Sequence, residues 1–208
     1  MIIAKIGYQD DKGMFQFFLS NRERLWVSYD FYRQQNLHQG DELSPSALEA
    51  LRGEHMRNAA FLLANRYVSY KPRTEQELAR HLQQKGISQG EISFSIERLE
   101  KLGLLDDSAY GIQFGKEKSQ NSHWSRNKIR RKLQERGLDP SEISRSLSQV
   151  SQEQEEENLR IAFEKSYRKR DLADYGQFQK TVAALARKGF SLSDVLAFLK
   201  KERDHGQC

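Results

Sequence analysis

The stretch that decides the fold is LQERGLDPSEI, residues 133–143. Two similar stretches occur in the same chain: LQQKGISQGEI at 82–92 and LARKGFSLSDV at 185–195. Their central glycines, Gly86, Gly137 and Gly189, are 51 and then 52 residues apart (137 − 86 and 189 − 137). A period of this length is typical of tandem structural units that bury their apolar faces against one another. We therefore interpret the chain as a repeat protein.

Each copy has the features of one helix that ends, a tight turn and a second helix that begins. In residues 133–143, Arg136 suits the negative end of a helix dipole, and Gly137 can adopt the left-handed conformation that closes a helix. Leu138 can pack back over that end, while Asp139 and Glu142 form a capping box for the next helix. The other copies place similar residues at these positions: Lys85, Ile87, Ser88 and Glu91, then Lys188, Phe190, Ser191 and Asp194. Apolar residues then recur four apart, at Ile92 and Ile96, Ile143 and Leu147, and Val195 and Leu199.

The fold class that we predict is mainly α, with three tandem three-helix repeats in an elongated array. The repeats are expected at 55–105, 106–150 and 151–208. Their helices are expected near 56–69, 75–85 and 89–103, near 107–121, 126–136 and 140–149, and near 152–170, 175–188 and 192–203. Thr74 and Glu77 form a further capping box, and Asp174 with Gln177 is a possible one. The third repeat is the most divergent, because Thr181 stands where Leu78 and Ile129 stand in the others.

Residues 1–54 form a small antiparallel β-rich domain in this interpretation. Apolar residues alternate over 2–8, 15–19 and 25–29, and the segments 10–13 and 20–22 supply turns. Asp30 is expected to cap a short helix over 31–37. Ser44 and Pro45 open a longer helix that extends as far as Tyr67, unless Gly53 interrupts it. The domain boundary is therefore placed near 54.

The composition is polar, with 37% hydrophobic and 30% charged residues, which suits small units with much surface for their core. The formal net charge is +5 (34 − 29), and residues 106–150 contribute +3 of it (9 − 6). This excess fits an acidic partner or nucleic acid. Cys208 is the single cysteine, which excludes an internal disulfide and a cysteine-based metal site. No apolar run suits a signal peptide or a membrane span, so a cytoplasmic protein is expected.

The sequence carries no motif of an enzyme. Phosphate-binding loops, dinucleotide-binding glycines, zinc-protease histidines and nucleophile elbows are all missing. The histidines are scattered without metal-ligand spacing, at 38, 55, 81, 123 and 205. Asp106 and Asp107 are the paired carboxylates considered for metal-dependent hydrolysis, but we interpret one as a helix cap and the other as facing the helix dipole. We expect no catalysis, no metal and no cofactor.

The candidate binding feature is the helix expected near 126–136. Ile129 and Leu133 mark its core-facing side, so its cations spread over the flanks and the outer face. The candidate partner-binding or DNA-binding residues are Lys116, Lys118, Trp124, Arg126, Lys128, Arg130, Arg131, Lys132 and Arg136, with a second cluster at Arg168, Lys169 and Arg170. Trp124 is a candidate for stacking on a base or anchoring a partner. The alternatives are a solvated basic face, a tryptophan that covers the core, and cations that suit a helix C-terminus.

A longer pattern surrounds this helix. It includes Ala60-Phe61-Leu62, Arg66, Arg73-Thr74-Glu75-Gln76-Glu77-Leu78, Gly103-Leu104-Leu105-Asp106-Asp107-Ser108-Ala109-Tyr110, Ile129-Arg130, Leu133 and Arg136-Gly137-Leu138. With this pattern, residues 58–150 resemble the RecX family of bacterial RecA regulators, and the similarity weakens after 150. Residues 1–54 look similar to the β-rich extension of some members. The chain departs from the family at Gly111, where alanine is usual, at Lys132, where an acid is usual, and at Trp124, near a usual glycine.

The resemblance implies a curved helical array that acts as a monomer on a RecA–DNA filament. Docking in the filament groove, against RecA and its single- or double-stranded DNA, would inhibit the recombinase, coprotease and ATPase activities of RecA. Homologous recombination, DNA repair and the SOS response would be modulated in this way. One alternative is a stand-alone DNA-binding protein that uses helix-turn-helix-like units. Another is a scaffold whose N-terminal domain recruits a further protein.

Overall fold

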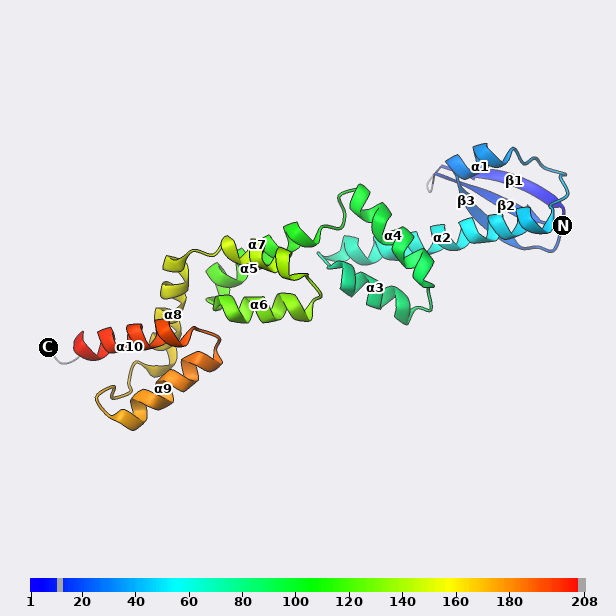
Figure 1. The fold of residues 1–208 in the computed structure, drawn as a ribbon. Coiled ribbons are helices and arrows are strands. Elements are labelled where there is room, and N and C mark those ends of the chain that lie inside the picture. Colours follow the sequence, from blue (N-terminus) through cyan, green and yellow to red (C-terminus); the bar gives the residue numbers. More distant parts are fainter. Residues whose placement is uncertain (11–12, 206–208) are drawn as a thin grey trace. The chain divides into compact units, whose positions relative to one another are not determined.

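A computed structural model gives the fold of this chain and describes residues 1–10 and 13–205 (Figure 1). Asp11 and Lys12, which belong to an expected turn, and the single cysteine Cys208 lie outside the described residues. The chain divides into two compact units. The first unit consists of residues 1–72 and 78–105, and the second consists of residues 73–77 and the chain from Asp106 onward.

The N-terminal strands form one antiparallel sheet in the order β1-β2-β3, as the alternating pattern predicts. The strands are β1 (Ile3–Gln9), β2 (Met14–Leu19) and β3 (Arg24–Ser28). The register pairs Phe17 of β2 with Ile6 of β1 and with Leu25 of β3. Phe17 is fully buried, so the centre of the sheet supplies the core of this domain.

Two helices follow the sheet; the first is capped by another residue than expected, and the second opens at Ser44 and Pro45 as expected. Helix α1 (Tyr29–Gln35) is capped by Ser28, whose hydroxyl accepts a hydrogen bond from the Phe31 N–H, so the predicted cap at Asp30 is wrong. Helix α2 (Pro45–Tyr70) starts at its Ser44 cap and continues through Gly53. The boundary placed near 54 therefore falls inside a continuous helix rather than in a linker. The first part of α2 packs on the sheet and the second part enters the first repeat (Figure 1).

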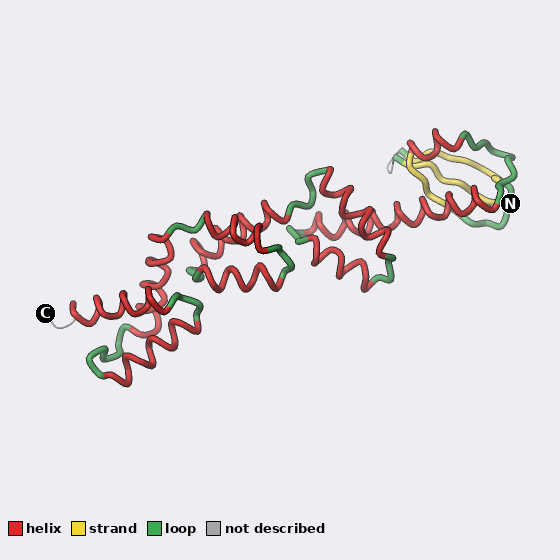
Figure 2. The backbone as a smooth tube through the Cα atoms, in the orientation of Figure 1, coloured by secondary structure: helices red, strands yellow, loops and turns green. Residues whose placement is uncertain are grey.

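The three repeats each contain three helices among the described residues (Figure 2). The end of α2 is joined by α3 (Glu75–Gln84) and α4 (Gln89–Lys101), and the second repeat contains α5 (Asp107–Ser122), α6 (Arg126–Glu135) and α7 (Pro140–Ser148). The third repeat contains α8 (Gln152–Tyr167), α9 (Tyr175–Arg187) and α10 (Leu192–His205). Each repeat has its own apolar core. The predicted fold class, three tandem three-helix repeats after a small antiparallel sheet, is confirmed.

The repeated stretch forms the same turn three times. Gly86, Gly137 and Gly189 have φ values of 77°, 91° and 96°, which lie in the left-handed region. In the second copy, the N–H of Gly137 donates to the carbonyl of Gln134 at 3.0 Å, and the N–H of Leu138 donates to the carbonyl of Leu133 at 3.2 Å. These two bonds satisfy carbonyls that the helix end leaves open. The apolar residues that recur four apart after each turn are buried, as expected.

The caps that follow these turns are correct in two copies and different in the first. Asp139 and Glu142 form the complete capping box, and Ser191 accepts from the N–H of Asp194 at 3.1 Å. Ser88 occupies the cap position of α4, but its hydroxyl donates to the carboxylate of Glu91 and makes no capping bond. The expected capping bond at Ser88 is therefore wrong, and the contact of this hydroxyl is with the Glu91 side chain.

Close packing of two helices explains why this chain has Gly111 where the resemblance to the RecX family leads us to expect alanine. Gly111 and Gly115 lie one helical turn apart on α5 and both face Ser146 of α7, so the two helices approach closely. A methyl group at Gly111 would come within 2.8 Å of a Leu138 methyl carbon, and one at Gly115 within 2.7 Å of the Ser146 hydroxyl. The Ser146 hydroxyl donates to the carbonyl of Gly111 across this contact. An alanine at Gly111 would have to displace the Leu138 side chain, and one at Gly115 would have to displace the Ser146 hydroxyl.

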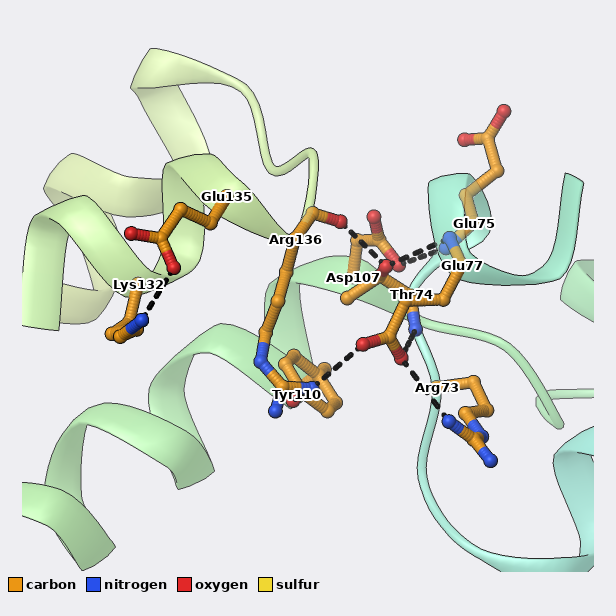
Figure 3. Close-up of polar contacts among 9 residues, drawn as sticks. All are labelled: Arg73, Thr74, Glu75, Glu77, Asp107, Tyr110, Lys132, Glu135 and Arg136. Carbon is orange, nitrogen blue, oxygen red and sulfur yellow. Dashed lines mark hydrogen bonds and ion pairs between the residues drawn. The ribbon is translucent and has the colours of Figure 1, made fainter. Parts of the chain in front are cut away.

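Two similar sets of hydrogen bonds, called junctions below, each join the start of the second helix of one repeat to the turn after the second helix of the next repeat. The first junction consists of Thr74, Glu75, Glu77, Asp107 and Arg136 (Figure 3). The Thr74 hydroxyl accepts from the Glu77 N–H at 3.2 Å and donates to the Arg136 carbonyl at 2.7 Å. The N–H of Glu75 donates to the Asp107 carboxylate at 2.9 Å. Asp107 therefore caps a second helix, which corrects the expectation that it only faces its own helix dipole; Asp106 caps α5 as expected.

The second junction repeats this arrangement with residues Ser125, Arg126, Lys128, Glu155 and Lys188. The Ser125 hydroxyl accepts from the Lys128 N–H at 3.3 Å and donates to the Lys188 carbonyl at 2.8 Å. The N–H of Arg126 donates to the Glu155 carboxylate at 2.9 Å. Both junctions thus place a hydroxyl cap against the residue that precedes a central glycine. A hydroxyl is needed because only a group that donates and accepts can make both bonds.

Candidate partner-binding surface

Helix α6 is oriented by its two buried side chains, as the sequence predicts. Ile129 and Leu133 are both fully buried in the core of the second repeat. Residues on the opposite side of the helix must then face solvent, because positions three or four apart share a face. Arg130 and Arg131 are exposed, and these two cations are available to a partner.

The exposed side of α6 carries one acid as well as its cations. Glu135 accepts a bond from the Lys132 ammonium at 2.5 Å and lies 3.9 Å from the Arg131 guanidinium. Lys132 and then Arg131 hold the pKa of the Glu135 carboxyl below its usual range. Arg130 instead donates to the neutral Asn127 side chain at 2.5 Å. The outer face of α6 is therefore positive, although Glu135 offsets one of its charges.

Arg126, a predicted binding residue, is engaged in holding the second and third repeats together. Its guanidinium donates to the Val150 carbonyl and to the side chain of Gln152, the latter at 3.4 Å. Its backbone N–H is bound by Glu155, which is 5% exposed. Burial raises the pKa of the Glu155 carboxyl, while the N–H and the charge of Arg126 act in the opposite direction. Arg126 is thus a structural residue of the second junction.

Arg136 has a similar structural role at the first junction (Figure 3). Its guanidinium donates to the Glu77 carboxylate at 2.8 Å and to the Tyr110 hydroxyl. It also lies over the Tyr110 and Phe114 rings, at 5.6 Å and 5.2 Å from their centroids. Burial raises the pKa of the Tyr110 hydroxyl, and the Arg136 charge opposes that rise. These contacts leave Arg136 less free to bind a partner than Arg130 or Arg131.

Trp124 lies against the core of the second repeat and is half-buried. Its ring meets Phe114 edge-on at 6.2 Å, and the Lys128 ammonium lies 3.9 Å from its centroid. Lys118 is also near these rings and pairs with Glu117 at 2.7 Å. The geometry favours the alternative in which Trp124 covers the core, because one face of its ring is occupied by Lys128.

The remaining predicted cations do not share one environment. Lys116 of α5 and Arg168 and Lys169 after α8 are exposed. Arg170 is half-buried, where it donates to the Thr181 hydroxyl at 3.1 Å and lies over the Tyr167 ring. This bond explains the divergent position in the third repeat: Thr181 is fully buried and also donates to the Gln177 carbonyl at 2.8 Å.

Two cations that the sequence reasoning did not select lie beside α6. Burial lowers the pKa of Lys128, and the charge of Lys188 lowers it further, together with those of Arg131 and Lys132. Lys165 of α8 lines the same pocket as Lys128 and Lys188. Their positions depend on the packing of the third repeat against α6, so helical periodicity within α6 could not reveal them.

Within residues 1–10 and 13–205, no group of three or more histidine, cysteine or acidic side chains is placed to hold a metal ion. His55 accepts from the Trp26 N–H, and His123 lies 3.3 Å from the Asn158 side chain. In the same described residues, every helix is too short or too polar to cross a bilayer.

Comparison with known proteins assigns the family. The three family models that match are RecX, first three-helix domain (residues 60–99), second three-helix domain (106–147) and third three-helix domain (153–199). The regulatory protein RecX of Lactobacillus delbrueckii subsp. bulgaricus is 33% identical over 153 residues, which cover 74% of this chain and 56% of that protein. The regulatory protein RecX of Enterococcus faecalis is 28% identical over 208 residues, which cover 95% of this chain and 77% of that protein.

Solved structures agree with these matches. A crystal structure of a regulatory protein RecX superposes with a TM-score of 0.80 at 25% identity and covers 96% of this chain and 98% of its own. RecX from Lactobacillus salivarius has the same fold, with a TM-score of 0.65 at 23% identity over 72% of this chain and 97% of its own. The relatives are named regulatory proteins, not enzymes, although the first of them extends well beyond the matched region. By its three matched domains, this chain belongs to the RecX family of regulatory proteins.

Proposed function

We propose that this chain regulates the RecA recombinase by binding RecA–DNA filaments and inhibiting their recombinase, coprotease and ATPase activities. The observation that carries the proposal is the set of three RecX three-helix domains, matched in order between residues 60 and 199. Through RecA, the chain would modulate homologous recombination, DNA repair and the SOS response. We assign this activity to a non-catalytic monomer in the cytoplasm. Elution of the purified chain near its mass of 24.3 kDa would support the monomer.

The exposed face of α6 is the surface that we propose for the filament. Arg130 and Arg131 are exposed, whereas Ile129 and Leu133 of the same helix are fully buried. Partner-binding energy is often concentrated in a few residues, and arginine is enriched among them because its planar group can form paired bonds with carboxylates or phosphates. Acidic groups of RecA and phosphates of the bound DNA are therefore both suitable contacts.

The decisive experiment is a titration of the DNA-dependent ATPase of RecA with this chain. We expect inhibition at amounts below one chain per RecA. The variant Arg130→Glu/Arg131→Glu should inhibit far less, because two attractive charges become repulsive. The matched control is Lys200→Glu/Lys201→Glu, which reverses two adjacent exposed charges on α10. Unchanged ATPase and strand exchange at equimolar wild-type chain would refute the proposal, and full inhibition by the α6 variant would move the surface elsewhere.

Stand-alone DNA binding is the second candidate function, and the cluster of Lys128, Arg131, Lys132 and Lys188 favours it. These cations lie close enough for their charges to act on Lys128. Binding through phosphates would weaken steeply as salt rises, because each neutralised phosphate releases counterions. If binding to naked DNA disappears near physiological salt while RecA binding persists, the RecA function is the primary one. Deletion of 1–54 would test whether the β-rich domain recruits a further protein.

A further inference from the structure

The two junctions differ at one pair of equivalent positions. At the first junction, the third residue of α3 is Glu77, which accepts a bond from Arg136, the residue before the central glycine, at 2.8 Å. At the second junction, the third residue of α6 is Lys128, and the residue before the central glycine is Lys188. An acid–base pair at the first junction is therefore replaced by two cations at the second.

Among the described residues, the side-chain charges that act on Lys128 are all positive. Burial lowers the pKa of Lys128, and Lys188, Arg131 and Lys132 lower it further. Like charges that are held together disfavour the charged form, whereas a nearby anion favours it. The nearest acid of the junction, Glu155, is occupied with the backbone N–H of Arg126. The second junction thus has an excess of positive charge where the first junction has a balanced pair.

A pocket of about 160 Å³ opens at this point. Three lysines, Lys128, Lys165 and Lys188, line it together with His123 and Ser122, and no carboxylate is among its lining residues. The volume is below the roughly 300–1,000 Å³ of sites that enclose a drug-sized ligand. The space therefore suits a small anionic group, either free or at the edge of a larger molecule.

We propose that this pocket binds a phosphate group, which takes the electrostatic place that the Glu77 carboxylate has at the first junction. Lysine ammonium groups bind phosphate as point charges and need no planar arrangement. A nucleobase is a poorer occupant, because Lys128 already covers one face of the Trp124 ring at 3.9 Å. The phosphate can come from a nucleic-acid backbone or from a free phosphate, and binding does not depend on RecA.

The test uses the full chain, sodium phosphate and a calorimetric titration at constant ionic strength against sodium chloride. Lys128→Glu restores the acid–base pair of the first junction. It should weaken phosphate binding by at least about tenfold, since a bond to a charged group contributes that much or more. In chloride, its melting temperature should equal or exceed that of the wild type. The matched control, Lys200→Glu, makes the same change at an exposed lysine of α10 outside the pocket and should bind phosphate within about twofold of the wild type.

A second variant covers the case in which Lys128→Glu does not fold. Lys188→Gln removes one pocket charge and leaves the Lys188 carbonyl free to accept from Ser125, so the junction bond is kept. Wild-type chain that responds to phosphate no more than to chloride would overturn the proposal, as would equal losses of phosphate binding in Lys188→Gln and Lys200→Glu. A short oligo(dT) added as competitor separates the sources. If the oligonucleotide displaces phosphate and its binding depends on Lys128, the ligand is a backbone phosphate. If the oligonucleotide does not displace phosphate, the ligand is a free anion.

Discussion

Replacing Arg136 by alanine should reduce the stability of the second unit rather than only its affinity for a partner. Arg136 belongs to the same run of cations as Arg130, and composition alone makes the two equivalent. In the structure, however, Arg136 donates to the Glu77 carboxylate and to the Tyr110 hydroxyl (Figure 3). Arg130 is exposed and contacts the side chain of Asn127. The two substitutions therefore separate a structural role from a surface role.

The magnitude follows from the exposure of the pair. A hydrogen bond to a charged group contributes about 1.5–3 kcal/mol when it is shielded, and an exposed ion pair contributes less than about 1 kcal/mol. The side chains of Arg136 and Glu77 are 36% and 19% exposed, which lies between these limits. We expect a coupling free energy of about 1–2 kcal/mol between them. The lost contact with two aromatic rings adds about 0.5–1 kcal/mol to the cost of Arg136→Ala.

The assay is urea unfolding followed by Trp124 fluorescence in a Trp26→Phe background, which leaves Trp124 as the one tryptophan of the chain. Arg136→Ala, Glu77→Ala and the double variant form a cycle that gives the coupling. Arg130→Ala is the control and should change the free energy of unfolding by less than about 0.5 kcal/mol. A coupling below about 0.5 kcal/mol, or equal losses for the two arginines, would refute the structural role.

Three further predictions test other parts of the fold. Gly137→Ala should destabilise the chain by about 1–3 kcal/mol more than Gly86→Ala in urea unfolding, because both add strain at positive φ but only Gly137 lacks room for a methyl group. Equal losses would contradict the close approach. The pKa of Glu23 is lowered from 4.5 to about 2, chiefly by its bond to Arg52, so this pair stabilises the fold above pH 4.5 and is lost as the pH falls towards 2. Glu23→Gln should therefore reduce the loss of unfolding free energy that occurs between pH 4.5 and pH 2. An unchanged pH dependence of the unfolding free energy would contradict a stabilising role of the pair. Asn158→Leu should lower the free energy of unfolding by about 1–3 kcal/mol for each buried group left without a partner, measured as a lower urea midpoint. An unchanged midpoint would mean that the two bonds donated by Asn158 contribute little to stability.

Periodicity and local turn chemistry were enough to predict the repeats. The left-handed glycines, the apolar pairs four residues apart and most caps depend on residues close together in sequence, and these were confirmed. The errors also have local causes. Ser28 directly precedes α1, whereas Asp30 already lies in its first turn, and the hydroxyl of Ser88 donates to the Glu91 carboxylate without capping α4. Gly53 costs too little helix propensity to break a helix that packs on two cores.

Helical spacing alone could not separate the structural from the exposed cations on α6. Once Ile129 and Leu133 are assigned to the core, Arg126, Arg130, Lys132 and Arg136 each lie three residues from one of them, so spacing places only Arg131 clearly on the outer side. The bonds that distinguish Arg126 and Arg136 go to partners far away in sequence, Val150 and Glu77 among them, and required the structure.

The second junction connects the candidate surface with the pocket. Lys128 belongs to both, because it lines the pocket and its charge is coupled to Arg131 on the outer side of α6. A partner that offers only carboxylates could bind Arg130 and Arg131 and leave the pocket empty. A polyanion with regularly spaced phosphates could occupy both, since one phosphate in the pocket would remove the repulsion between Lys128 and Lys188. Lys128→Glu should therefore weaken binding to DNA while leaving inhibition of RecA intact if the outer face meets protein, and should weaken both if it meets the DNA of the filament.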